Sequence, residues 1–317
     1  IAPVKEEQFI KKEDFIPILN KWKRNFDHRD GGMSQVPKFV IPSNFQFLLR
    51  YSFQNKDENL KEFVFKSLDK ISYGGIYDHI EGGFSRYSVD ERWHIPHFEK
   101  MLYDNAQMVN LYSEAFLATN DNWYKEVVTQ TLEFVKNDLT SSKGGFYSSL
   151  DADSLDAENK LEEGAYYSWT KADLKQLLKE DFELFADYFN INPIGKWEKE
   201  VYVPIRTLSN DQFIQKHSIS SKELIEKKDY WREILKQQRA SRDKPRLDDK
   251  QLTSWNSLMI SGYIEAYKAF QTEAYLKAAL KNAEFILKNL YKEDGSLHHS
   301  YKNGQSKING YLEDYAF

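Results

Sequence analysis

The residue types most able to do chemistry are gathered in residues 74–105, where carboxylates, guanidinium groups and imidazoles stand close together. A histidine such as His97 or His79 can accept and release a proton near neutral pH. The same side chains can instead cap helices, with Glu99 in a first turn and Asp104 bonded to a neighbouring turn. Both interpretations remain open at this point, because buried charges are costly unless they are paired. The candidate residues of this stretch are Asp78, His79, Tyr87, Arg92, Trp93, His97, Glu99 and Asp104.

Pro96 favours the first turn of a helix, so the sequence predicts that His97 and Glu99 lie at or near a helix N-terminus. There the helix dipole would favour the charge of Glu99 and lower the pKa of a histidine. His94 and His97 have a spacing compatible with a metal, but Pro96 separates them and no third ligand is evident. We therefore expect no metal at this position.

A second group flanks a predicted hairpin, with Asp151 and Glu163 as candidate catalytic acids and Asp153 and Tyr167 as candidate binding residues. Asp151-x-Asp153 has the opening spacing of a calcium loop. The fifth and sixth positions are then a leucine and an aspartate, where an oxygen ligand and a glycine are required. Turn hydrogen bonds are the structural alternative for these carboxylates.

A third group occupies residues 246–256. Adjacent acids, a lysine, a tryptophan and an asparagine at one helix start are typical of a sugar site, where the aromatic ring stacks on the sugar and the polar groups bind its hydroxyls. The structural alternative is that Thr253 or Asp249 caps the helix. The candidates here are Asp249, Lys250, Trp255 and Asn256, and a weaker fourth group contains His298, His299 and Tyr301.

These groups lie in turns that follow predicted helices, and the turns share a glycine signal, such as Gly82-Gly83 and Gly144-Gly145. The apolar spacing between the signals is helical and predicts about ten helices. We interpret the pattern as an internal repeat of helical hairpins with uneven spacing. In a closed ring of hairpins such turns converge at one end. We also expect residues 145–150 to pair with 164–169, residues 191–210 to form a loop, and residues 310–317 to open a further helix.

The composition of the chain excludes several kinds of site and partner. The 317 residues carry 44 Lys and Arg against 49 Asp and Glu, a net charge of −5, and no cysteine. This excludes disulfides, thiolate metal sites and a cysteine nucleophile, and mild acidity argues against a nucleic-acid partner. No apolar run is long enough for a membrane span. The first residues have no signal-peptide core, residue 1 is not a methionine, and we expect a cytoplasmic fragment of a longer protein. With no composition shift along the chain, residues 1–317 are expected to form a single all-α domain.

Several long motifs make the sequence recognisable. The stretches GGIYDHIEGGFSRYSVDERWHIPHFEKMLYDNAQM, GGFYSSLDADS, EGAYYSWT and DDKQLTSWNSLMI closely resemble the YyaL / spermatogenesis-associated protein 20 family. DGGMSQVPKF and GYLEDYAF add to the match, which runs in order over nearly the whole chain. The sequence departs from the family pattern at Gln35, Val36 and Val40 and in a longer 154–163 loop.

The resemblance implies an (α/α)6 toroid, complete or incomplete here, like those of six-hairpin glycosidases and N-acylglucosamine 2-epimerases. It also implies a thioredoxin-like domain that precedes this region in the full-length protein. No metal and no organic cofactor follow from it. A carbohydrate ligand is the expected partner.

Two reactions and a non-catalytic role remain open. Glycoside hydrolysis needs two carboxyl groups roughly 5–10 Å apart, and the candidates are Asp78, Asp151, Asp153, Glu163 and Asp249. Epimerisation needs two proton-transfer groups, for which His79 and His97 are available, with Arg92 or Lys250 to stabilise an enediolate. The alternative is a sugar- or protein-binding module, or a scaffold, that serves the thioredoxin-like domain.

Overall fold

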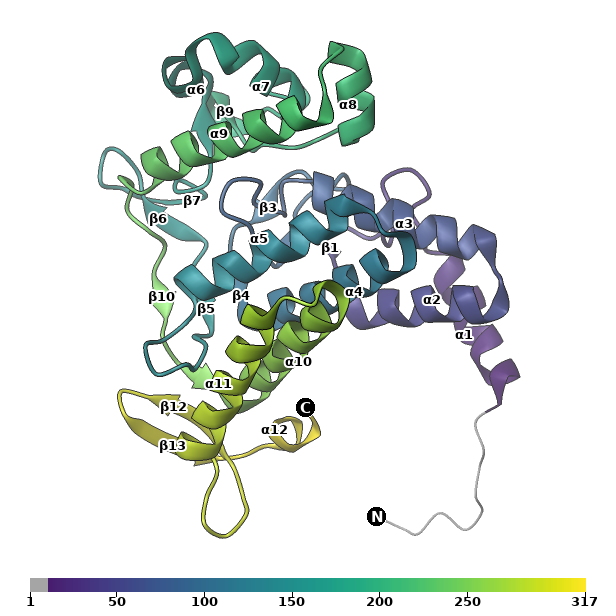
Figure 1. Ribbon diagram of the computed structural model, residues 1–317, viewed down its shortest axis with the longest axis vertical. Coiled ribbons are helices and arrows are strands. Elements are labelled where there is room, and N and C mark those ends of the chain that lie inside the picture. The colour runs from purple at the N-terminus through teal and green to yellow at the C-terminus, as the bar shows by residue number, and fades with distance from the viewer. Residues whose placement is uncertain (1–10) are drawn as a thin grey trace.

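The computed structural model describes residues 11–317 and is organised around three helical hairpins (Figure 1). Each hairpin turns through a left-handed residue, Lys56, Asn120 or Gln271, and in the first two the next residue, Asp57 or Asp121, caps the second helix with its side chain. The hairpins are α2 (Pro42–Asn55) with α3 (Glu58–Tyr73), α4 (Leu102–Thr119) with α5 (Asn122–Asp138), and α10 (Thr253–Phe270) with α11 (Glu273–Asn289).

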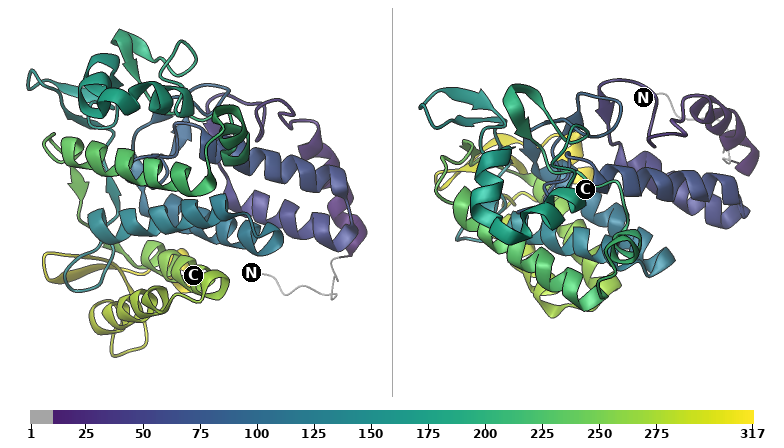
Figure 2. Two further views of the ribbon diagram at one scale, coloured as in Figure 1. Left: turned by 45° about the horizontal axis from the view of Figure 1, so that its top comes forward. Right: turned by 90° about the horizontal axis from the view of Figure 1, so that it is seen from above.

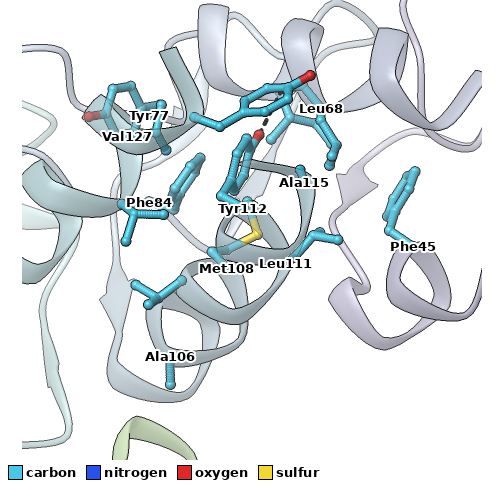
Figure 3. Packing of buried hydrophobic residues seen from close by; sticks show 14 of the residues in the cluster. Phe45, Leu68, Tyr77, Phe84, Ala106, Met108, Leu111, Tyr112, Ala115 and Val127 are labelled. Atoms are coloured by element: carbon cyan, nitrogen blue, oxygen red, sulfur yellow. Dashed lines mark hydrogen bonds between the residues drawn. The ribbon is translucent and has the colours of Figure 1, made fainter. Parts of the chain in front are cut away.

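The first helices of the three hairpins form an inner layer, in which α4 lies between α2 and α10, and α3, α5 and α11 lie outside them. Close approach of α4 and α10 depends on Gly262, where an added Cβ would stand 3.0 Å from the carbonyl oxygen of Ala106. Inside this arc the Tyr112 hydroxyl donates to the Leu68 carbonyl at 2.7 Å, among buried side chains (Figure 3). The prediction of an α/α toroid with short strands in its loops is confirmed for this arc.

The turns that precede the inner helices repeat the same hydrogen bonds, which supports the predicted internal repeat. In α4, Asn105 accepts from the Phe84 N–H at 2.7 Å and donates to the Phe84 carbonyl at 3.0 Å. In α10, Asn256 makes the same pair of bonds to Phe146, at 2.7 and 3.0 Å. Each asparagine therefore fixes the Gly-Gly-Phe turn of the preceding repeat against its own helix.

A buried lysine completes the same turn in two of the repeats. Lys38 lies 2.5 Å from Asp27, Lys100 lies 2.9 Å from Asp78, and each lysine also donates to a carbonyl of its Gly-Gly turn. In the third repeat the uncharged Gln251 takes this position, since like the two lysines it begins the short strand before its helix, and it contacts the turn through Ser141. The polar residues at this end of the arc thus belong in part to its architecture.

Short antiparallel strands connect these turns. They are β1 (Lys38–Phe39), β2 (Tyr87–Ser88) and β3 (Pro96–His97) in one sheet, β4 (Lys100–Met101), β5 (Ser149–Leu150) and β10 (Leu247–Asp248) in a second, and β11 (Gln251–Leu252), β12 (His298–Lys302) and β13 (Gln305–Asn309) in a third. Two further pairs are β6 (Asp153–Leu155) with β7 (Leu161–Glu163), and β8 (Trp169–Thr170) with β9 (Val201–Tyr202). The predicted pairing of 145–150 with 164–169 is therefore wrong, because Trp169 pairs with Tyr202, in part of the predicted 191–210 loop.

The chain between β5 and β10 forms a second helical layer with its own apolar core, around Trp231, Phe185 and Leu174. Its long helix α9 (Ser221–Arg239) runs beside α5 (Figure 2), with an ion pair of 2.6 Å between Lys228 and Glu126. The remaining helices are α1 (Ile16–Lys23), α6 (Lys171–Leu178), α7 (Phe182–Tyr188), α8 (Asn210–His217), α9 (Ser221–Arg239) and α12 (Leu312–Ala316), with 3-10 turns η1 (Lys12–Phe15), η2 (Lys179–Asp181) and η3 (Glu198–Glu200).

The final residues form α12, as the sequence predicts for 310–317. Across the described part of the chain, every helix is too short or too polar to span a lipid bilayer.

Candidate functional site

The strands β3 and β4 sort the polar residues of the 96–101 segment onto two sides. His97 and Glu99 are half-buried and share one side, with His97 Nε2 3.8 Å from the Glu99 carboxylate. Phe98 and Lys100 are buried on the other. The predicted helix start at His97 is wrong, because β3 pairs with β2 and α4 begins only at Leu102.

His97 is held by an aromatic ring and by two carboxylates. Its ring stacks on Tyr87 with centroids 4.9 Å apart, and its Nδ1 lies 2.8 Å from Glu163, at the end of β7. A carboxylate thus faces each ring nitrogen, and the shorter contact, with Glu163, favours the tautomer that carries its proton on Nδ1. The structure thus brings together four of the predicted site residues.

Asp104, in the first turn of α4, is an acid without a cation in hydrogen-bond contact, as is Asp69 of α3, which accepts from the Tyr124 hydroxyl instead. Its Oδ2 is shielded from solvent and has no hydrogen-bond partner among the residues that the structure describes. Burial raises the pKa of Asp104 to about 7, while the charge of Arg86 and the Tyr103 hydroxyl act in the opposite direction. Near neutral pH this carboxyl is able to hold or release a proton.

Arg86 and Tyr103 link Asp104 to the His97 group. The guanidinium lies 3.3 Å from Glu99, and although burial lowers its pKa, Tyr103 and Glu99 more than compensate and the pKa is raised. The Tyr103 ring lies 4.8 Å from that of Trp255, at the start of α10. We call this set, Arg86, Tyr87, His97, Glu99, Tyr103, Asp104, Glu163 and Trp255, the His97 cluster.

Two members of this cluster are not among the site residues that the sequence predicts. Arg86 lies within the polar stretch, and Tyr103 is adjacent to Asp104. Strand pairing was the missing information, because it decides which residues face Glu99.

Asp78 lies in the interior, where it is bound to two cations. It contacts Lys100 at 2.9 Å and Arg239 at 2.8 Å, and both cations are almost fully buried. Burial raises its pKa, but the charges of Arg239 and Lys100 outweigh this and hold it well below the usual range. Asp78 is therefore ionised and paired, an arrangement that stabilises the fold and leaves it no proton to transfer.

His79 and three other candidate residues also pack in the interior. Burial, together with the charge of Arg206, lowers the pKa of His79 to about 3, and its Nε2 faces the Tyr73 carbonyl at 3.2 Å. The imidazole is consequently neutral and does not share a surface with the His97 cluster. Trp93, Tyr167 and Asn256 are likewise buried, the last as the clamp described above.

The remaining candidates lie near the surface in ion pairs or turns. Asp151 lies 2.9 Å from Arg246, and Asp249 lies 2.5 Å from Lys302. Lys250 lies 3.1 Å from Asp248. Asp153 pairs with Glu163 in the β6–β7 ladder, and Arg92 is exposed.

The helix α10 has no side-chain cap from Thr253 or Asp249. Asp314 of α12 instead accepts from the Ser254 N–H at 2.9 Å and from His299 at 2.8 Å. His299, Glu313 and Asp314 have possible ligand atoms within 4.8 Å of one another. Because backbone and imidazole groups already occupy the Asp314 oxygens, this group is explained as a helix cap.

The hairpin β6–β7 separates the His97 cluster from a cavity of about 560 Å³. Glu163 faces His97, while its neighbour Glu162 lines the cavity together with Arg242 and Asp173. A second hollow, of about 600 Å³, lies along α2 beside Phe47 and Tyr51. Neither is lined by His97 or Asp104.

No family model matches the chain. Similar sequences are the uncharacterized protein B0495.5 of Caenorhabditis elegans, 36% identical over 96% of this chain and 46% of that protein, and spermatogenesis-associated protein 20. The human form of the latter is 31% identical, and the mouse form 33%, each over 92% of this chain and 41% of the relative. The chain thus spans less than half the length of these relatives.

Solved structures with a similar course of the chain include a sugar epimerase from a ruminal bacterium, with a TM-score of 0.38 and 13% identity over 92% of this chain and 89% of that one. Cellobiose 2-epimerase from Spirochaeta thermophila gives a TM-score of 0.37 and 16% identity over 93% and 88%. A family 76 glycoside hydrolase from Bacteroides thetaiotaomicron gives 0.33 and 11% over 92% and 58%.

Proposed function

We propose that this chain, which belongs to the family of spermatogenesis-associated protein 20, is a sugar-converting domain. The proposal is based on a group of titratable side chains that lies at the strand-bearing end of its toroidal arc. The proposed reaction is proton exchange at a carbon next to a sugar carbonyl, as in 2-epimerisation or aldose–ketose isomerisation. The proposed site is the His97 cluster.

The observation that carries this proposal is the contrast between Asp104 and the other acids. Asp78, Asp151 and Asp249 are tied to cations, whereas Asp104 keeps a shielded oxygen free of partners among the described residues and has a pKa of about 7. A group with a pKa near the working pH is the most effective general acid or base. Asp104 would supply one of the two proton-transfer groups, and His97 the other.

The neighbours of these two residues fit an enediolate intermediate. Arg86 carries a permanent positive charge next to both Glu99 and Asp104, and a cation stabilises negative charge that develops on the sugar oxygens. Tyr103 and Trp255 would offer ring faces to the pyranose. Glu163 would keep His97 in the tautomer whose Nε2 accepts the proton.

Glycoside hydrolysis has less support, because it needs a second carboxylate free to act as nucleophile or base. Three of the five candidates, Asp78, Asp151 and Asp249, are engaged in ion pairs with cations, and Glu163 contacts His97.

A sugar-binding module without catalysis is the second candidate. The same ion pairs favour it, as does the aromatic pair of Tyr103 and Trp255, because a binding site needs oriented polar groups and ring faces but no free acid. The two candidates share a ligand and differ in the role of Asp104.

Proton exchange in heavy water separates the two. The chain is incubated with reducing mono- and disaccharides, including N-acylated amino sugars, and deuterium at C2 is followed by NMR. For the enzyme we expect exchange that falls at least about 100-fold in Asp104→Asn and in His97→Gln, the usual loss for a general acid or base. Asp249→Asn, at a paired surface acid, should retain the exchange.

A parallel thermal-shift measurement reports binding. A sugar at about 100 times its dissociation constant adds about 2.7 kcal/mol to the stability. Stabilisation by a sugar without exchange would establish the binding module and refute catalysis. If no sugar of the panel stabilises the chain and none undergoes exchange, both functions are refuted for this chain.

A further inference from the structure

A buried group of cations occupies the seam between the arc of hairpins and the second helical layer. Arg206, in the segment that leads to α8, faces Lys228 and Arg232 of α9 across a small cavity, which α5 closes with Glu126. The ribbon shows α5 and α9 running side by side along this seam (Figure 2). The two layers therefore meet at a place rich in positive charge.

The charges at this seam do not balance. Arg206 is 5% exposed, and the side chains of Lys228 and Arg232 are 9% and 16% exposed. Glu126 lies 2.6 Å from Lys228, and Glu133 lies 3.7 Å from Arg232 but is about half exposed. Three shielded cations thus have one carboxylate in close contact, since Asp69 interacts with the charge of Arg206 without forming an ion pair with it, and buried cations require compensation.

The guanidinium of Arg206 keeps two nitrogens unsatisfied. Its Nη2 donates to the Leu208 carbonyl at 3.1 Å and to Asn210 at 2.7 Å. Its Nε and Nη1 are buried and have no hydrogen-bond partner in residues 11–317, and the same holds for Nη2 of Arg232. Buried N–H groups of this kind are normally satisfied by a solvent molecule or an ion.

Aromatic rings fix Arg206 in this position. Its guanidinium lies 4.3 Å from the ring centroid of Trp123, 4.5 Å from that of Tyr73 and 4.7 Å from that of Tyr188. The ring faces offset part of its charge. They cannot accept the in-plane N–H groups, so these remain available in a preformed position.

The neighbouring groups respond to the positive potential. Burial lowers the pKa of His79 to about 3, with a further contribution from Arg206. Burial also lowers the pKa of Lys228, and here too the charges of Arg206 and Arg232 contribute, against Glu126. The other groups at the cavity, Gln130 and Phe189 among them, carry no charge.

We propose that this seam binds a monatomic anion, with chloride as the natural occupant. The cavity has a volume of about 10 Å³, on the scale of a single water molecule, so a monatomic anion needs the least outward movement of the cavity walls, and phosphate, sulfate and carboxylates need more. A halide accepts several N–H groups at once and supplies the missing negative charge. The bound ion ties α9 and the Arg206 segment to α5.

The test compares halide salts with gluconate at equal ionic strength. We expect the thermal midpoint of the chain to rise with chloride or bromide concentration in a saturable way. Arg206→Met keeps an apolar chain between the rings. In this variant the apparent dissociation constant of the halide should rise at least tenfold. Arg246→Met, at an exposed arginine, serves as the matched control and should retain the halide response.

Two outcomes of the salt comparison would overturn the proposal. One is an equal response to halide and gluconate in the parent chain, and the other is an equal halide response in the parent and Arg206→Met. Crystals grown in bromide provide an independent measurement that does not depend on the folding of a variant. An anomalous peak within hydrogen-bond distance of Arg206 supports the site, and an ordered water there refutes it.

Discussion

Asp104→Asn should change the pH dependence of stability in a direction opposite to that of most carboxylate substitutions. In the folded chain the pKa of Asp104 is about 7, against 3.8 for an ordinary aspartate. Between these values the folded state keeps the proton and the unfolded state releases it. Stability must therefore fall as the pH rises from about 4 to about 7 and then level off.

The structure sets the size of this effect. The interval from 3.8 to about 7, at about 1.4 kcal/mol per pH unit, gives an upper bound of about 4 kcal/mol lost at pH 8. Part of Asp104 is accessible to solvent, so we expect about 1–2 kcal/mol to be measured. An asparagine has the same shape and does not ionise, so it should match the wild type near pH 4 and exceed it at pH 8.

Urea unfolding of both chains at pH 4, 5, 6, 7 and 8 measures this difference directly, because other titrating groups are common to the two. Asp57→Asn is the control. Hydrogen bonding to Lys23 lowers the pKa of Asp57, so its substitution should shift stability by a similar amount at every pH from 6 to 8. Parallel curves for the wild type and Asp104→Asn would refute a proton held by Asp104 near neutral pH.

Three further substitutions test the architecture by chemical denaturation. Asn256→Ala should cost about 1–3 kcal/mol, because it leaves the buried backbone groups of Phe146 unpaired; an unchanged midpoint would show that the clamp is dispensable. Asp78→Asn should cost about 3–5 kcal/mol, since two buried cations lose their counter-charge; a loss below about 1 kcal/mol would contradict that assignment. Gly82→Ala should destabilise at least as strongly as the first of these, because its φ is +83° and an added Cβ would stand 2.2 Å from the Gln130 carbonyl oxygen; a neutral result would mean that the turn relaxes easily.

The helical arc was accessible from the sequence because local signals agree with the global fold. Apolar spacing indicated the helices, and aspartates at positions 57 and 121 begin the outer ones as capping residues. The glycine pairs marked the turns, and the asparagine clamps of α4 and α10 now show why these turns recur. Such features depend on residues a few positions apart.

The polar residues could not be sorted in the same way, because their partners are distant in the sequence. Asp78 and His79 are adjacent in the sequence, yet one pairs with Arg239 and the other packs beneath Trp123. Pro96 predicted a helix, but residues 96 and 97 form the strand β3 instead. This strand pairs with β2 and stacks His97 on Tyr87. Sequence patterns identified the chemically dense segment and left open which of its side chains are exposed.

The pairing of β5 with β10 has a consequence for how this chain can vary. Leu150 and Leu247 are opposite each other, and the Asp151 N–H donates to the Arg246 carbonyl at 2.9 Å. The chain thus leaves the arc after Leu150 and returns to it at Leu247, so the two ends of the second helical layer are adjacent. A segment with adjoining ends can lengthen, shorten or be exchanged without moving either anchor. Changes in length are accordingly best tolerated in the loops of this layer that lie away from α5, because Arg239 and Lys228 of α9 must keep their partners Asp78 and Glu126 in the arc.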